Sequence, residues 1–110
     1  NAYESYKKAH EMDPSDANIL SNWGSTLFKE GLILYEKDSK AQNPHFCAAS
    51  CKYADSLASV LDYNEEALIR LGYAIITAFQ VKKEGESLSG DLCNAMSTYV
   101  KVATSFANKD

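Results

Sequence analysis

The sequence of 110 residues predicts an all-α fold, and three observations support this prediction. Apolar side chains recur at the three- and four-residue spacing that places them on one face of a helix. The alternation of apolar and polar residues that marks a half-buried strand is absent, and β-branched residues are scattered. The chain also has only two prolines and five glycines, so few positions interrupt a long helix.

The first helix is predicted over residues 2–12, with an apolar face formed by Ala2, Tyr6, Ala9 and Met12. Pro14 ends this helix because proline cannot continue an interior helical turn. Ser15 or Asp16 is expected to cap the second helix, predicted over 17–38. Its apolar face is expected to run through Leu20, Trp23, Leu27, Leu32 and Tyr35.

Three more helices are predicted in the rest of the chain. Asn43 as the cap and Pro44 in the first turn predict a helix over 44–61. The short turn 62–64 leads to a helix over 65–82, and a charged loop containing Gly85 follows it. The last helix is predicted over 91–107, with Ser89 or Asp91 as its cap. Short connections make neighbouring helices antiparallel, so we expect about five antiparallel helices.

Bulk composition limits the classes of function. Residues 1–110 are the length of one domain, and the absence of an initial methionine favours a fragment or a processed protein. A net charge of −4 argues against nucleic acid as a partner, because binding phosphate requires clustered Lys and Arg. No apolar run is long enough for a transmembrane segment. The three cysteines, an odd and sparse count, favour an intracellular, reducing setting.

Two glycines are each surrounded by the same pattern of apolar residues, which we call the apolar frame. The first frame is Leu20-x-x-Trp23-Gly24-x-x-Leu27, and the second is Leu68-x-x-Leu71-Gly72-x-x-Ile75. Glycine inside a helix costs about 1 kcal/mol relative to alanine, so a helix retains it mainly where another element must come close. Two such sites in matching surroundings predict one packing unit used twice.

The residues around these frames extend the pattern. Ala2-x-x-x-Tyr6-x-x-Ala9 and Pro14 precede the first frame, and Ala95-x-x-x-Tyr99-x-x-Val102 follows the second. The whole stretch resembles the tetratricopeptide repeat, a helical hairpin with the pattern W-x2-L-G-x2-Y, then A-x3-F, then P. The resemblance implies a right-handed stack of helical hairpins that binds other proteins and has no enzymatic activity.

The chain departs from the ordinary repeat in two respects. Repeats of this family are about 34 residues long, whereas Gly24 and Gly72 are 48 positions apart. The extra length falls after Glu30 and after Gln80, which predicts elongated helices or long connecting loops. Asp62 stands where the family has proline.

The resemblance also implies a binding groove. It is lined by residues that belong to the first helix of each repeat and lie outside the apolar frame. In this chain they are Asn18, Ser21, Ser25, Phe28 and Lys29 from one helix and Glu66, Ile69, Tyr73 and Ile76 from another. The second set is notably apolar, and exposed apolar surface usually marks an interaction site. We therefore expect a protein or peptide partner. The alternative is that another helix, or the rest of a longer protein, covers this surface.

Two further interpretations stay open within this family. One is a structural or scaffold subunit held in a large assembly. The other is a mitochondrial presequence import receptor, because Pro14-x-Asp16-Ala17-Asn18 before Trp23-Gly24 is similar to the plant-type outer-membrane receptor. The expected location is therefore cytosol-facing or organellar. Receptors that clamp chaperone tails place Asn directly after the frame glycine, and Ser25 and Tyr73 argue against that role.

Other candidate residues are interpreted as structural. His45-x-Cys47-x-x-x-Cys51 lacks a credible fourth zinc ligand nearby, and buried cysteine is common in cores. His10 places a favourable charge at a helix end, and Glu65-Glu66 does the same at a helix start. The sequence contains no phosphate-binding glycine loop and no nucleophile motif. We therefore expect no catalytic residues, no metal and no cofactor.

Overall fold

The computed structural model describes residues 2–59, 65–83, 85–86 and 89–108. These residues form five α-helices and no strand, so the predicted all-α class is confirmed for the described part of the chain. The helices are α1 (Ala2–Met12), α2 (Ala17–Lys37), α3 (His45–Ala58), α4 (Glu65–Val81) and α5 (Gly90–Ala107). Predicted and observed bounds differ by at most one residue, except at the end of α3. That helix was predicted to reach residue 61, and residues 60–61 lie outside the described ranges.

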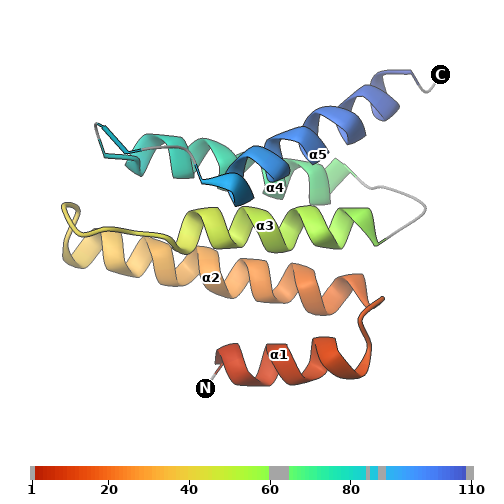
Figure 1. Ribbon diagram of the computed structural model, residues 1–110, viewed down its shortest axis with the longest axis horizontal. Coiled ribbons are helices and arrows are strands. Elements are labelled where there is room, and N and C mark those ends of the chain that lie inside the picture. The colour runs from red at the N-terminus through yellow and green to blue at the C-terminus, as the bar shows by residue number, and fades with distance from the viewer. Residues whose placement is uncertain (1, 60–64, 84, 87–88, 109–110) are drawn as a thin grey trace.

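The chain reverses direction at each connection, so consecutive helices run in opposite directions (Figure 1). α3 is the central helix, because it packs against α2 on one side and against α4 and α5 on the other. α1 packs mainly on α2 and forms the outermost layer. α4 and α5 also contact each other.

Local side-chain bonds start two of the helices. The Asp16 carboxylate accepts a hydrogen bond from the backbone N–H of Asn18 at 2.9 Å, and the Ser89 hydroxyl accepts one from Leu92 at 3.0 Å. Each bond satisfies a backbone donor that has no partner within its helix. The interpretation of Asn43 as a cap was wrong. Pro44 occupies the cap position of α3, and the Asn43 side-chain amide instead donates to the carbonyl oxygen of Gly31 at 2.9 Å.

The main hydrophobic core lies between α3, α4 and α5. Phe46 and Leu57 from α3, Leu71 from α4 and Leu92 from α5 are at most 2% exposed. Leu27 and Phe28 of α2 pack against the edge of this cluster. Burial of apolar surface on this scale is the main force that holds the helices together.

Both frame glycines lie where an aromatic ring of the following helix comes close. A Cβ atom at Gly24 would be 2.9 Å from the Tyr53 ring, and one at Gly72 would be 3.0 Å from the Tyr99 ring. Ala49 and Ala95, four residues before these tyrosines, are at most 1% exposed. The repeat pattern predicted the pair Ala95 and Tyr99 but not the equivalent pair Ala49 and Tyr53 on α3.

Gly31 makes a third close approach that the sequence analysis did not predict. A Cβ atom there would be 2.9 Å from the Phe46 ring. The inner face of α2 therefore continues through Gly31 and half-buried Leu34. The expectation that Leu32 and Tyr35 continue this face was wrong, because their side chains are 48% and 47% exposed.

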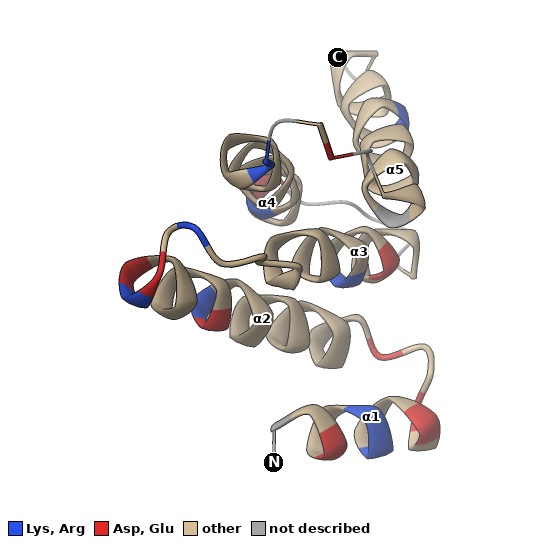
Figure 2. Ribbon diagram, turned by 60° about the vertical axis from the view of Figure 1, so that its left-hand side comes forward, with Lys and Arg blue, Asp and Glu red and all other residues tan. Residues whose placement is uncertain are grey.

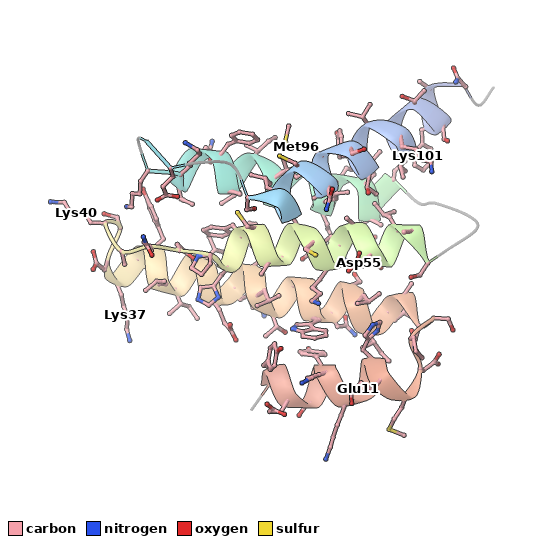
Figure 3. The ribbon with its side chains drawn as sticks, viewed as in Figure 1. Glu11, Lys37, Lys40, Asp55, Met96 and Lys101 are labelled. Carbon is pink, nitrogen blue, oxygen red and sulfur yellow. The ribbon has the colours of Figure 1, made fainter. Side chains whose placement is uncertain are left out.

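Trp23 joins α1 to the rest of the molecule. Its side chain is buried, as predicted for a core residue, and it stacks on Tyr6 with 6.1 Å between ring centroids. Tyr3 and His10 meet the same ring edge-on, and the Lys52 ammonium lies 4.0 Å from its centroid. Side chains from α1 and α2 fill the space between these helices (Figure 3).

Candidate functional site

α4 exposes a row of large apolar side chains. Ile69, Tyr73, Ile76 and Phe79 are 56%, 64%, 57% and 41% exposed. They are spaced by four, three and three residues, so they lie along one side of the helix. The row is about 15 Å long at the helical rise per residue. We call these four residues the α4 row.

The opposite side of α4 holds the helix in place. Leu71, Ala74, Ile75 and Ala78 are buried and belong to the main core. The small residues at 74 and 78 let α4 lie close to its neighbours. The partly buried Ala67, Leu68 and Val81 also pack against this core, and the α4 row remains on the surface.

Charged groups are few around this row. Figure 2 shows that charged residues gather on α1 and at the end of α2, whereas the described parts of α4 and α5 carry few. Glu66 forms an ion pair with Arg70 one turn further along α4, so its charge is largely balanced. The exposed charges beside the start of the α4 row are therefore this ion pair and Glu65.

The predicted groove residues of α2 differ from those of α4. Asn18 and Lys29 are exposed, while Ser21 and Ser25 are half-buried. The Ser25 hydroxyl is hydrogen-bonded to the Tyr53 hydroxyl at 2.8 Å. Phe28 packs edge-on against Phe46, with ring centroids 5.1 Å apart, and so contributes to the core.

The structure places the two predicted sets on separate helices. α2 and α4 each pack on α3, and neither is a main neighbour of the other. The α2 set is polar except for Phe28, so most of the apolar residues predicted for the groove lie on α4. The exposed apolar character belongs to Ile69, Tyr73 and Ile76.

Several exposed apolar residues were not among the predicted site residues. Phe79 extends the α4 row by a further turn, and its spacing of three residues from Ile76 was the available signal. On α2, Leu32, Ile33 and Tyr35 are all exposed, and no periodicity distinguished them from core positions.

The candidate metal ligands have other neighbours. The His45 imidazole lies 3.6 Å from the Glu30 carboxylate, and the Cys51 thiol lies 3.9 Å from Asp55. Cys47 is half-buried against the core, and Cys93 is exposed. Among the described residues, no group of three or more His, Cys, Asp or Glu side chains is arranged to hold a metal ion.

Comparison with known proteins identified no relative. No family model, curated protein or solved structure matches the chain significantly. Among the described helices, none combines the length and the apolar character needed to cross a lipid bilayer.

Proposed function

We propose that this chain is a helical-repeat domain of the tetratricopeptide type that binds another protein and catalyses no reaction. The observation that carries the proposal is the α4 row, in which three predicted groove residues are more than half exposed. Isolated exposed apolar residues are common on soluble proteins, but a contiguous row is typical of an interaction site.

The repeated contact between glycine and tyrosine supports the repeat assignment. Gly24 faces Tyr53 across α2 and α3, and Gly72 faces Tyr99 across α4 and α5. The same contact thus recurs in two consecutive helix pairs. A right-handed stack of such hairpins would place α2 and α4 as first helices, as the resemblance implies.

The partner we propose is an amphipathic helix from another protein. A helix presents apolar side chains every three or four residues, and the α4 row has the same spacing over about 15 Å. Tyr73 is the best single anchor, because it is the most exposed member of the row and interface energy concentrates in residues such as tyrosine. Phe28 contributes less, since Phe46 already covers part of its ring.

The test is a pull-down from cell lysate with the full chain, followed by titration of the recovered partner. The double substitution Tyr73→Ala and Ile69→Ser should weaken binding by about 2 kcal/mol, or roughly thirtyfold. Circular dichroism and melting temperature should remain near those of the wild type, because both side chains are exposed.

Val100→Ser is the matched control, since Val100 is 63% exposed on α5 and lies outside the α4 row. It should leave affinity unchanged. Full affinity in the double variant would show that the α4 row is not the binding surface. Unfolding of the double variant would instead mean that Ile69 and Tyr73 belong to a core. That outcome would favour a scaffold subunit, in which the row is permanently covered.

A further inference from the structure

The α4 row has charged residues of opposite sign at its two ends. Glu65 lies four residues before Ile69, and Lys83 lies four residues after Phe79. Residues four apart lie on the same side of a helix, so Glu65 belongs to the side that carries the row. Lys83 extends that side just beyond Val81, the last residue of α4. The surface therefore begins with an acid, continues through four apolar side chains and ends with a base.

These two end charges have no ion-pair partner among the described residues. The Lys83 ammonium donates one hydrogen bond, to the carbonyl oxygen of Ser39 at 2.9 Å. An ammonium group has three donors, so two remain for a carboxylate. Glu66 differs from Glu65 in this respect, because Arg70 already pairs with it.

The spacing of this surface is nearly symmetric about Ala74. Glu65 and Lys83 are each nine positions from that residue. Ile69 and Phe79 are each five positions from it, and the two inner members of the row are one and two positions away. Two antiparallel copies of α4 that meet at this level would place Ile69 of one copy beside Phe79 of the other. A two-fold interface has this property, since it uses the same self-complementary surface on both subunits.

The end charges favour the antiparallel arrangement over the parallel one. In an antiparallel pair, Glu65 of each copy lies beside Lys83 of the other, so the attraction occurs twice. In a parallel pair, Glu65 would lie beside Glu65 and Lys83 beside Lys83, and like charges repel. Charged residues that flank an apolar seam set the orientation of paired helices in the same way.

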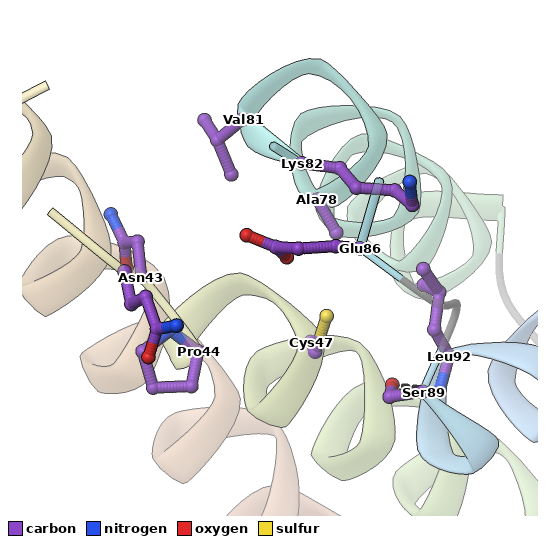
Figure 4. A pocket seen from close by; sticks show the side chains of 10 residues that line it. Asn43, Pro44, Cys47, Ala78, Val81, Lys82, Glu86, Ser89 and Leu92 are labelled. Atoms are coloured by element: carbon purple, nitrogen blue, oxygen red, sulfur yellow. Dashed lines mark hydrogen bonds between the residues drawn. The ribbon is translucent and has the colours of Figure 1, made fainter. Parts of the chain in front are cut away.

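The outer side of α4 is open to a second copy. Figure 2 shows α3 and α5 against α4, while the α4 row stays exposed. A pocket of about 350 Å³ lies on the inner side, where the start of α3, the end of α4 and the start of α5 meet (Figure 4). No residue of the α4 row lines this pocket. The row is thus an open surface, which suits a protein face better than a small molecule.

We infer that the α4 row pairs antiparallel with the α4 row of a second copy of this chain, in a weak dimer that hides the partner-binding surface. The inference rests on the proposed function, because it takes the row as an interaction surface. Four apolar residues per copy are few beside the 20–30 residues of a standard interface, so we expect a dissociation constant of about 10–1,000 μM. Only the monomer exposes the row, so the apparent affinity for another protein should fall as the dimer forms.

The first experiment is sedimentation equilibrium of the full chain at concentrations from about 5 μM to about 2 mM, which span the expected dissociation constant. The wild type should show a reversible monomer–dimer equilibrium. The double variant Tyr73→Ala and Ile69→Ser should remain monomeric. Val100→Ser is the control and should dimerise as the wild type does, because Val100 lies on α5 outside the row.

A charge exchange tests the orientation. Glu65→Lys should weaken the dimer roughly tenfold, because two attractive contacts become repulsive. Adding Lys83→Glu to this variant should restore the dissociation constant to within about threefold of the wild type, since the pairs then form with reversed signs. Glu11→Lys is the matched control: it makes the same change on α1, the outermost layer, and should have no effect. Circular dichroism would confirm that each variant is folded.

Three results would overturn the inference. They are a wild type that stays monomeric at every concentration, a dimer that persists in the Tyr73→Ala and Ile69→Ser variant, and a charge exchange that fails to restore the dimer. None of them bears on the binding of another protein, which the pull-down and titration measure separately. Conversely, a dimer with the expected charge dependence would support the inference even if the double variant kept full affinity for the recovered partner, a result that refutes the proposed function alone.

Discussion

Tyr53 lies so close to Gly24 that a Cβ atom on the glycine would be 2.9 Å from two carbons of the tyrosine ring. Gly72 and Tyr99 repeat this relationship one helix pair further along the chain, at 3.0 Å. In both pairs a ring occupies the space that any larger residue would need. The glycine thus sets how closely the two helices approach.

Gly24→Leu and Gly72→Leu should therefore destabilise the protein. Overpacking a tight contact typically costs about 1–3 kcal/mol. Gly90→Leu is the matched control, because nothing lies within 4 Å of its Cβ position. Its free energy of unfolding should stay within about 0.5 kcal/mol of the wild type. Thermal melts of the three variants would test this, and equal melting temperatures would refute the packing argument.

Trp23→Ala should cost about 3–5 kcal/mol, the usual range for removing a large buried aromatic side chain. The loss should fall mainly on the packing of α1, which uses Tyr6 and His10 to contact this ring. Lys52→Ala should cost about 0.5–1 kcal/mol, since it removes only the interaction of the cation with the ring. Urea unfolding would measure both values. Similar losses in the two variants would contradict a core role for Trp23.

Tyr53→Phe should destabilise the protein by about 0.5–1.5 kcal/mol through loss of the hydrogen bond to Ser25. The ring remains in place, so the contact with Gly24 should be unaffected. Ser25→Ala removes the same bond, and the two substitutions together should cost less than the sum of the single losses. Strict additivity in this double-mutant cycle would mean that the bond contributes nothing.

The cysteines should be reduced and metal-free, with different reactivities. Cys93 is exposed, whereas Cys47 is half-buried, so Cys93 should react first with a thiol-alkylating reagent. Mass spectrometry of the alkylated protein would give the order of reaction, and native mass spectrometry would report any bound metal. A stoichiometric zinc adduct that disappears in Cys47→Ser would contradict the structural interpretation of this residue.

The positions of the helices follow from local chemistry and were predictable. Pro14 ends α1 because it cannot continue a helical turn, and Ser89 starts α5 because its hydroxyl bonds the backbone three residues later. Gly24 and Gly72 were also identifiable, since each interrupts a run of helix formers at one position in a repeated frame. Such signals act within a few residues, so the sequence alone carries them.

Tertiary structure decided which apolar helix faces are covered by other helices. Leu32 and Leu34 are both apolar residues of α2, but Leu32 is exposed and Leu34 is half-buried. Leu34 lies three residues after Gly31, and so on the side of the helix that the Phe46 ring approaches. Phe28 and Ile76 occupy equivalent positions after the two frame glycines. Phe28 is partly covered by Phe46, whereas no described helix covers Ile76. Exposure depends on contacts between residues far apart in the chain, and periodicity within one helix cannot specify them.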